Sequence, residues 1–576
     1  MITKRFQTEH PVYTEANECQ DCFKCVRHCP VKAIRLADGS ASVIPEACVA
    51  CGECVSVCPV GAKRVRDDLE RVQALLDGNR RVLVSLAPSF PAEFRDLTTE
   101  QLIRALRRLG VEAVSETALG AQQVSANVAA LLREQPEPRL HISSACPAAV
   151  EVLRKYHPDL GRYVTGFMSP LLAHCRMLRQ KYGEDVAIVF VGPCIGKKRE
   201  ADRHPELLDV ALTFGETRRL FELRRVDPHL LRPDPRSDRF APEQAEEGAL
   251  YPVDGGMIAG IKANCSVSEA TFMAVSGIRS IPAALEGLDP DNLAAPLFLE
   301  LLACEGGCVN GPLMASRTGT VAKRLAVINR ARYERAKIPR QATIDVRVRD
   351  PEPVIVPPSF GSDQIRRALQ QVGKTQPEDE LNCGGCGYDD CRAFAVALLQ
   401  GKAEPPMCVS HMRKLAQKKA NALINTMPSG VVMVDSRRKI VECNRRFAAL
   451  MGPEAETIYD ALPGMEGALI RRVAPFHQLF ETVLDGGTRY VERDVRHENR
   501  FLHVTAFNIE AGQLAGAIVQ DVTEPNVQRE QVIARAQEVM RRNLETVQQI
   551  ASLLGENAAE SEVVLNSIIE SVCPPS

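Results

Sequence analysis

The sequence has no apolar run long enough to cross a membrane. A membrane-spanning helix needs roughly 18 or more consecutive apolar residues, and no stretch of this 576-residue chain approaches that length. The first ten residues, MITKRFQTEH, also lack the apolar core of a secretory signal peptide. We therefore expect a cytoplasmic protein that makes no use of a membrane.

A strong excess of charge of either sign is also missing. The net charge is -2, from 71 basic and 73 acidic residues, which gives no argument for a nucleic-acid partner or an anionic surface. The chain is too long for a single hydrophobic core, so about three to five domains are expected.

Cysteine, in contrast, is plentiful, and the 20 cysteines fall in metal-ligand spacings rather than in a disulfide pattern. Residues 19–30 read C-x2-C-x2-C-x3-C-P, and residues 48–59 repeat it. This is the bacterial two-cluster ferredoxin pattern, in which the fourth cysteine of each run ligates the other cluster. A zinc ribbon, the alternative, would have two C-x2-C pairs. The predicted first ferredoxin set is Cys19, Cys22, Cys25 and Cys58, and the second is Cys48, Cys51, Cys54 and Cys29.

Three further loops offer four more thiols. Cys304 and Cys308 form a C-x3-C clasp in LLACEGGCVNGP, where Gly306 and Gly307 leave the backbone unhindered. Short apolar runs at 81–88, 141–147 and 186–193 end at turn residues, as buried parallel strands do. Two cysteines follow such runs, where open α/β sheets place ligands, and we call these four the loop set: Cys146, Cys194, Cys304 and Cys308. They favour an iron–sulfur cluster, with ordinary buried cysteines as the alternative.

These loops resemble the three signature motifs of the [FeFe]-hydrogenase catalytic domain, and YPVDGG at 251–256 resembles its Gly-Gly segment. The resemblance covers roughly residues 1–320. It implies that the loop set holds a [4Fe-4S] cluster and that Cys308 bridges to a two-iron subcluster carrying CO, cyanide and a dithiolate. It also implies a hydrogen bond from Lys197 to a cyanide ligand, matches Glu200 to a second-motif glutamate, and places Gly306 and Gly307 at the cofactor. The implied substrates are H2 and protons, with a ferredoxin-type electron carrier.

The sequence departs from this family where protons are handled. Catalytic members carry a proton-relaying cysteine at the position of Ala145, and the stretch NVAALL at 127–132 lacks the relay carboxylates. Thr165 keeps a hydroxyl at the place of a relay serine, whereas Gly192 and Leu302 replace methionines. General acid–base groups commonly contribute about 10²–10⁴-fold, so slow H2 turnover is expected.

Two more segments follow the Pro-rich, charged stretch 324–380, which reads as a linker with one short helix. Residues 383–408 have the spacing C-x2-C-x4-C-x16-C and resemble a small [4Fe-4S] module, with zinc as the alternative. We call its cysteines the module set: Cys383, Cys386, Cys391 and Cys408. Residues 413–525 resemble a PAS domain, in which His497 and His503 are better explained as ordinary strand residues than as metal ligands.

The last fifty residues read as helical. Ile533, Met540, Val547 and Leu554 recur every seven residues, which predicts either a parallel homodimeric coiled coil or a helix that packs on the PAS domain. No histidine follows His503 and no glycine-rich ATP-binding stretch is present, so a signalling kinase or phosphatase would act in trans. Four cysteines have no cluster assignment: Cys175, Cys265, Cys443 and Cys573.

The predicted fold class is multidomain α/β. Its parts are a two-cluster ferredoxin-like domain (1–75), an α/β H-cluster domain (76–345), a [4Fe-4S] module (360–412), an α+β PAS-like domain (413–525) and a helical tail (526–576). The domain order resembles the sensory group of [FeFe]-hydrogenases. The predicted function is H2 or redox sensing with slow H2 oxidation and proton reduction. The alternatives are a slow metabolic, ferredoxin-linked hydrogenase and an iron–sulfur scaffold without the two-iron subcluster.

Overall fold

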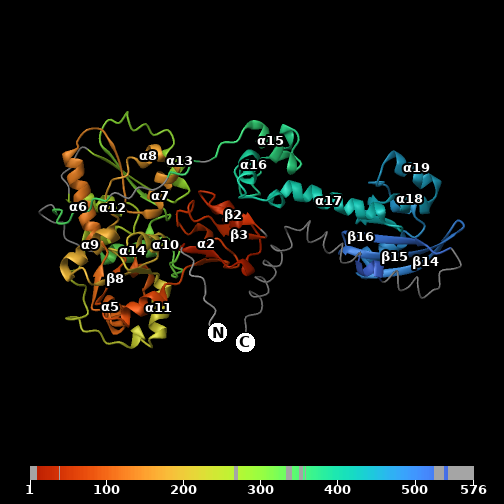
Figure 1. Ribbon diagram of the computed structural model, residues 1–576. Coiled ribbons are helices and arrows are strands. Elements are labelled where there is room, and N and C mark those ends of the chain that lie inside the picture. Colours follow the sequence, from red (N-terminus) through yellow and green to blue (C-terminus); the bar gives the residue numbers. More distant parts are fainter. Residues whose placement is uncertain are drawn as a thin grey trace. The chain divides into compact units, whose positions relative to one another are not determined.

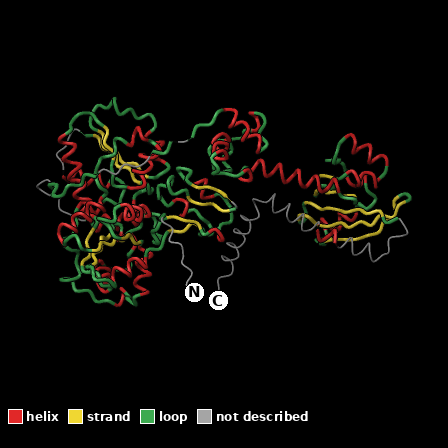
Figure 2. Tube along the Cα trace, in the orientation of Figure 1, coloured by secondary structure: helices red, strands yellow, loops and turns green. Residues whose placement is uncertain are grey.

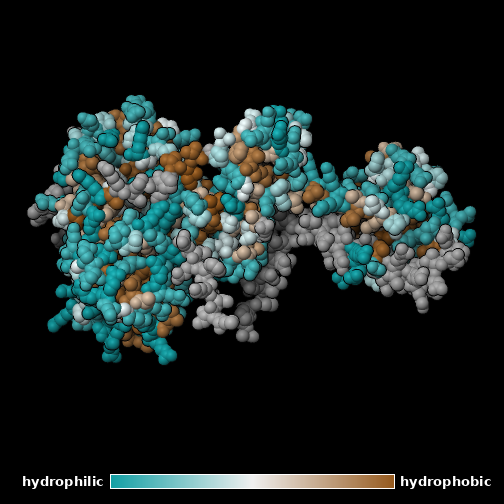
Figure 3. Space-filling model, in the orientation of Figure 1, coloured by the Kyte–Doolittle hydropathy of each residue, from teal (hydrophilic) through white to brown (hydrophobic). Residues whose placement is uncertain are grey.

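The computed structural model describes residues 10–37, 39–264, 270–331, 340–348, 354–356, 358–523 and 538–542. The chain divides into two compact units, Met1–Met407 and Cys408–Ser576, and each is described by itself. Figure 1 labels the helices and strands, and Figure 2 shows how the two types are distributed. None of the described helices is both long and apolar enough to cross a membrane. The face drawn in Figure 3 is mostly hydrophilic.

The first unit begins with the two cysteine runs, which wrap around two short helices, α1 (Lys24–His28) and α2 (Glu53–Ser56). A left-handed residue precedes each helix: Phe23 with φ 56° and Gly52 with φ 88°. The duplicated spacing thus produces a duplicated turn. Two antiparallel pairs frame these helices: β1 (Val12–Thr14) with β4 (Lys63–Val65), and β2 (Ile34–Ala37) with β3 (Ser40–Val43).

Two separate parallel sheets form the α/β part that follows. One has the order β6 (Ala113–Glu116), β5 (Val82–Leu86), β8 (Ala187–Val191), β9 (Val210–Leu212). The other has the order β10 (Thr271–Ser276), β11 (Leu297–Leu302), β7 (Leu140–Ile142). The strand predictions at 81–88 and 186–193 are confirmed by β5 and β8, and β7 is shorter than the predicted run. Strands β5 and β8 are buried at every position, as their mostly apolar sequences predict.

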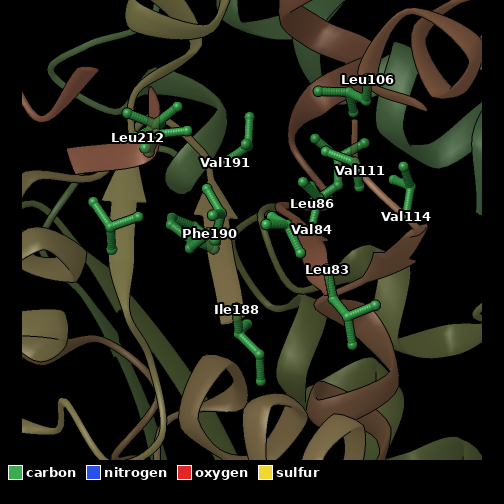
Figure 4. Close-up of a cluster of buried hydrophobic side chains, with 14 of the residues drawn as sticks. Leu83, Val84, Leu86, Leu106, Val111, Val114, Ile188, Phe190, Val191 and Leu212 are labelled. Atoms are coloured by element: carbon green, nitrogen blue, oxygen red, sulfur yellow. The ribbon is translucent and has the colours of Figure 1, made fainter. Parts of the chain in front are cut away.

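Figure 4 shows part of this core, where Leu83, Val84 and Leu86 of β5 lie near Ile188 and Phe190 of β8. The helices that cover the sheets include a closely packed pair, α6 and α9: a side chain at Gly120 of α6 would put its Cβ 2.2 Å from the Pro170 carbonyl oxygen. The helices of this part are α3 (Leu69–Leu76), α4 (Phe90–Glu93), α5 (Thr99–Arg108), α6 (Ala118–Glu134), α7 (Pro147–Tyr156), α8 (Pro158–Gly161), α9 (Pro170–Tyr182), α10 (Ile195–Arg203), α11 (Phe214–Leu223), α12 (Gly256–Asn264), α13 (Ser280–Leu285) and α14 (Thr320–Arg330).

Buried charged side chains join the cysteine-run segment to the α/β part. Lys198 of α10 is fully buried and donates to Asp68 Oδ2 (2.8 Å) and Glu216 Oε1 (2.9 Å). Lys155 of α7 donates to the carbonyl oxygens of Glu46 (3.0 Å) and Cys48 (3.2 Å). Removing one partner of such a buried pair leaves an uncompensated charge, so these contacts hold the two segments in one arrangement.

The linker prediction for 324–380 is wrong in part. Helix α14 extends to Arg330, and Ile344 and Val346 are buried in an apolar cluster with residues of α6 and α12. Ile344 and Val346 alternate with charged residues in the sequence, but their side chains enter the core. Residues 332–339, 349–353 and 357 lie outside the described part of the chain. Helices α15 (Ser362–Gln371) and α16 (Cys391–Leu399) then pack together and end the first unit.

The second unit contains a five-stranded antiparallel sheet of order β13 (Ile440–Cys443), β12 (Gly430–Asp435), β16 (Leu514–Asp521), β15 (Arg500–Glu510), β14 (Tyr490–His497). Asn444 organises its start: its side chain caps the following helix at Phe447 N (2.9 Å) and donates to the Ile424 carbonyl oxygen of α17 (2.8 Å). The helices are α17 (Val409–Thr426), α18 (Arg445–Met451), α19 (Pro453–Ala461), α20 (Ile470–Val473) and α21 (Gln478–Asp485). The predicted tail at 526–576 lies outside the described residues except for 538–542.

Candidate metal centre

The loop set lies at the carboxyl ends of three parallel strands. Cys146 follows β7 and is the residue before α7, and Cys194 follows β8 and is the residue before α10. Cys304 follows β11, and Cys308 opens a single 3-10 turn, η4 (Cys308–Asn310). The carboxyl ends of parallel strands are where open α/β sheets bind ligands, and the two sheets here present their cysteines to the same place.

One cavity brings all four cysteines together. Lys197, Ala145 and Leu302 also line it, as does Cys51 of the second ferredoxin set. Cys51 reaches the cavity because the neighbouring Gly52 has no side chain: a Cβ there would lie 2.6 Å from Pro312 and 2.9 Å from Ile195. The site therefore unites ligand candidates from four segments of the sequence.

The paired glycines of the clasp do not line this cavity. Gly307 has φ 102°, and a Cβ there would lie 2.3 Å from the Pro252 carbonyl oxygen. Gly306, with φ 73°, lines a second cavity beside Cys304 and Cys51. Both positions need glycine for backbone conformation, and Gly307 also lets the clasp lie directly against the YPVDGG segment.

Burial favours the protonated form of three of the cavity thiols, Cys194, Cys304 and Cys308. Burial raises the pKa of Cys194 to about 11. It also raises the pKa of Cys308 and that of Cys304, and neighbouring cysteines of the set raise both further. One sulfur already accepts a backbone hydrogen bond, from Ala303 N to Cys146 Sγ at 3.4 Å. Metal binding must displace these protons, so cysteine desolvation and metal binding are coupled here.

Lys197 brings one positive charge to the cavity wall. Its Nζ lies 2.7 Å from Glu200 Oε2 and donates to Ser169 Oγ at 3.0 Å, and Ser169 Oγ donates to the same carboxylate. Burial lowers the pKa of Lys197, but Glu200 and Cys194 together more than offset burial, so the pKa is raised. The ammonium group therefore stays charged and is aimed by a fixed carboxylate, which suits it to hold an anionic ligand.

Two departures from the family pattern have visible physical consequences. Ala145 lines the cavity with a methyl group, and its backbone N donates to Ser143 Oγ at 3.1 Å. Gly192 cannot simply be exchanged for a methionine, because a Cβ there would lie 2.4 Å from Phe190 Cζ and 2.7 Å from Ala87 Cβ. Phe190 lines the cavity as well, so this ring takes up space beside position 192. Thr165 lies outside the cavity and donates to Ser144 Oγ at 3.3 Å.

Glu300 is a buried carboxyl near the cavity, close enough to Cys308 to affect the pKa of that thiol, and it is not among the sequence-predicted candidates. It sits in β11, is 1% exposed, and accepts a hydrogen bond from Ile258 N on Oε2 (3.1 Å), while Oε1 has no partner. Burial raises its pKa to about 7, and nearby Asp254 contributes in the same direction. Tyr251 and Ser125 share a buried hydrogen bond of 2.9 Å on the same side of the sheet. The signal was a single glutamate inside the apolar run LFLELL.

The first ferredoxin set lines a cavity of its own. Its four members Cys19, Cys22, Cys25 and Cys58 face a cavity of about 350 Å³ together with Lys63 and Asp21. Cys22 is exposed, so this cavity lies near solvent. Burial raises the pKa of Cys25 to about 11.

The second ferredoxin set is more deeply buried. Burial raises the pKa of Cys48 to about 11. Burial also raises the pKa of Cys51, and the neighbouring Cys29, Cys54 and Cys48 raise it further. Two sulfurs accept backbone hydrogen bonds: Cys29 from Ala33 N (3.2 Å) and Cys48 from Ala50 N (3.3 Å). Such bonds favour a charged sulfur. Cys29 of the first run therefore lies near cysteines of the second run, which is consistent with the predicted exchange of fourth cysteines between the two runs.

The module set is divided between the two units. Cys383 and Cys386 lie in a loop with left-handed glycines at 384 and 387, and Cys391 opens α16 with its N donating to Asn382 Oδ1 (2.9 Å). Cys408 begins the second unit and directly precedes α17.

The remaining predicted candidates form no centre in the described residues. Cys175 and Cys443 are buried single thiols, and Cys265 and Cys573 lie outside the described residues. His503 pairs with Asp494 (2.6 Å), and His497 contacts the Met451 carbonyl oxygen (3.2 Å).

Comparison with known families agrees with this geometry. Residues 80–312 match the C-terminal domain of the iron-only hydrogenase large subunit, and residues 18–62 match a 4Fe-4S dicluster domain. Residues 379–410 match a putative Fe-S cluster family, and residues 419–491 match a PAS domain. By these matches the chain resembles the iron-only hydrogenases over residues 80–312 and also carries segments similar to iron–sulfur domains and to a PAS domain. The predicted family resemblance and fold class are thereby confirmed.

Individual relatives are distant. Iron hydrogenase 1 of Clostridium pasteurianum is 25% identical over 301 residues, which is 43% of this chain and 52% of the relative. The chain thus spans about half the length of this curated relative. Among solved structures, a variant of the [FeFe]-hydrogenase HydA1 from Chlamydomonas reinhardtii is 20% identical with a TM-score of 0.37, covering 48% of this chain and 91% of that one. The PAS domain of an HTR-like protein from Haloarcula marismortui is 22% identical with a TM-score of 0.15, covering 20% and 98%.

Proposed function

We propose that this protein senses H2, or the redox state set by H2, and turns H2 over slowly. The observation that carries the proposal is the cavity at the strand ends. It keeps four convergent cysteines and the charged Lys197, yet presents a methyl group at Ala145. Ligands are retained while the acid–base group is missing, which favours binding and slow reaction over rapid catalysis.

The residues present fit the implied cofactor. Among the described residues, no three His, Cys, Asp or Glu side chains form a group that could hold a single metal ion. The four thiols of the loop set line one cavity, and cysteine thiolates are the ligands of iron–sulfur clusters. The loop set would hold a [4Fe-4S] cluster, with Cys308 shared with a two-iron subcluster that supplies H2 cleavage and proton reduction when bound. Lys197 would hold a cyanide ligand through Nζ. The two ferredoxin sets and the module set would hold three more clusters, about eighteen irons in all.

Proton delivery to the cavity is the slow step of the proposed H2 turnover. The Ala145 methyl group can neither hold nor pass a proton. The Lys197 ammonium group already donates a hydrogen bond to Glu200. Glu300 is the buried carboxyl near the cavity whose pKa, about 7, lets it hold a proton on its unpartnered Oε1 at neutral pH. Ala145 therefore limits delivery, and the remaining acid can support only slow exchange.

The proposed output is a signal to a partner protein, set by the redox state of the clusters. Electrons from H2 would reach the accessory clusters, and the PAS domain at 419–491 would transmit the change to a signalling kinase or phosphatase in trans. A homodimer formed through the heptads of 526–576 is part of this proposal.

The test is reduction of the accessory clusters by H2 alone. The matured protein is equilibrated under H2 or under argon, and reduced [4Fe-4S] signals are measured by electron paramagnetic resonance. H2 should reduce accessory clusters in the wild type but not in Cys308→Ser, whereas dithionite should reduce them in both. Equal spectra under H2 and argon in the wild type would refute H2 sensing.

A second function, a slow metabolic hydrogenase, is favoured by one feature. The first ferredoxin set lines a cavity near solvent with Cys22 exposed, where a ferredoxin-type carrier can exchange electrons. Sustained turnover with such a carrier, together with no H2-dependent change in any partner's output, would decide for this alternative.

A further inference from the structure

The loop that carries Cys383 and Cys386 packs directly against α1, which lies within the first N-terminal cysteine run. Gly387 makes the closest approach: a Cβ there would lie 3.1 Å from both Arg27 N and Val26 Cγ1. Two cations of the ferredoxin-like segment hold the loop by its backbone. Arg27 Nη1 donates to the Gly385 carbonyl oxygen (3.2 Å), and Lys32 Nζ donates to that of Gly387 (2.7 Å).

A second contact keeps the whole module against this segment. Leu36 N of β2 donates to the Lys402 carbonyl oxygen at 3.0 Å, beyond the end of α16. Lys32 also lies 5.9 Å from the centre of the Tyr388 ring and 4.0 Å from Asp389. The module is therefore docked on the ferredoxin-like segment by several independent contacts.

Tyr388 lies at the centre of this junction. The side chain is 5% exposed and its hydroxyl has no hydrogen-bond partner. Its ring packs near Phe394 of α16, with the two ring centres 5.9 Å apart. The buried ring therefore has both the module helix α16 and Lys32 of the ferredoxin-like segment as neighbours.

The second ferredoxin set has another neighbour. Cys51 lines the cavity of the loop set and also the adjoining cavity beside Cys304. The same set therefore reaches the proposed H2 site through Cys51, and its member Cys29 lies in the short stretch between Arg27 and Lys32, the two residues that hold the module loop. The first ferredoxin set instead faces its own cavity, where Cys22 is exposed.

We infer that the cluster held by Cys29, Cys48, Cys51 and Cys54 is a branch point for electrons. One branch leads to the first ferredoxin set and an external carrier. The other crosses the Gly387–Tyr388 junction to the module cluster, whose last cysteine directly precedes α17 and the PAS domain. Each transfer moves one electron, which oxidises the second ferredoxin cluster and reduces the module cluster, and no atom is exchanged. The inference rests on the proposed clusters but not on H2 chemistry.

The test measures magnetic coupling between clusters in the full chain after reduction with dithionite. Two reduced clusters that lie close together broaden and split each other's paramagnetic resonance signals. Gly387→Ala should weaken the coupling of the module cluster, because its methyl group pushes the loop away from Arg27. Gly384→Ala is the matched control: it has the same left-handed strain (φ 69°), but its Cβ would meet only the Tyr388 carbonyl oxygen, at 3.8 Å.

A second pair of variants does not depend on backbone strain. Tyr388→Ala removes the buried ring and should weaken the coupling, whereas Tyr388→Phe keeps the ring and should preserve it. Iron content should be unchanged in all four variants. Unchanged coupling in both Gly387→Ala and Tyr388→Ala would overturn the junction, as would equal loss in Gly384→Ala.

Arg27 also donates to the Cys22 carbonyl oxygen through Nη2 (3.0 Å), so the module loop is linked to the first ferredoxin set as well. A separate test therefore decides which of the two ferredoxin clusters couples to the module cluster. Cys22→Ser, which disables the first ferredoxin cluster, should leave the coupling of the module cluster intact. If that coupling disappears instead, the module is connected to the first ferredoxin set and the branch point is wrong. Failure here leaves the H2 proposal standing, since that depends on the loop set.

Discussion

Glu300→Gln should abolish a buried acid that changes its charge near neutral pH. The Glu300 carboxyl has an ordinary pKa of 4.5, which burial in β11 raises to about 7. A carboxyl with a pKa of about 7 is ten times more often protonated than ionised at pH 6, and the ratio is reversed at pH 8. An anionic cluster bound beside Glu300 would move the pKa in the same upward direction.

The same shift predicts a change in stability with pH. Because the folded pKa is raised, ionisation of Glu300 opposes folding, and the cost grows from about pH 4.5 to about pH 7 and is constant above that. At high pH the cost is about 3 kcal/mol. The stability of Glu300→Gln relative to wild type should therefore improve by about 2 to 3 kcal/mol between pH 5 and pH 8.

Infrared difference spectroscopy across pH measures the proton directly. The wild type should show a carbonyl band of a buried protonated carboxylic acid that disappears through about pH 7, and Glu300→Gln should lack it. Glu305→Gln, at an exposed position of the neighbouring clasp, is the control and should keep the band. A wild-type band that titrates near pH 4.5, or one that survives Glu300→Gln, would refute this reasoning.

Four other changes have defined outcomes. Ala145→Cys should raise H2 evolution, measured with a chemical reductant and normalised to cofactor content, by less than the usual roughly 10²–10⁴-fold of a general acid–base group; an unchanged rate would show that proton delivery is not limiting. Gly192→Met should lower stability by about 1–3 kcal/mol in denaturant unfolding, and Phe190→Ala should relieve the effect if the ring is the obstacle. Lys198→Met should cost about 3–5 kcal/mol, because two buried carboxylates lose their partner; a loss below about 1 kcal/mol would mean that they are hydrated or protonated. Cys383→Ser should remove about four irons and leave the cofactor bands of the loop set unchanged, and loss of those bands would mean that the module supports the α/β part.

Local pattern was enough to predict most of the elements. The runs at 81–88 and 186–193 form β5 and β8 because they are mostly apolar, with Ser85 as the polar residue inside β5. In the region that resembles a PAS domain, the chain forms the antiparallel sheet that includes β14, β15 and β16. Each of these depends on short-range periodicity, which a sequence displays directly.

Long-range contacts could not be predicted in the same way. Nothing local shows that Ile344 and Val346 return to the core, because their neighbours are charged. The side chain of Phe190 beside Gly192, and the docking of Gly387 on α1, join residues whose sequence positions carry no mutual signal. Glu300 is visible in the sequence as a charged residue in an apolar run, but its pKa of about 7 follows from its burial, which the sequence does not show.

The central claim is that the loop set holds an H2-reactive two-iron subcluster. The most direct measurement is an infrared spectrum of the protein after assembly with the two-iron unit, recorded under argon and then under H2. The account predicts stretching bands of CO and cyanide that shift when H2 is admitted. A spectrum without such bands after assembly, or with bands that do not respond to H2, would contradict it.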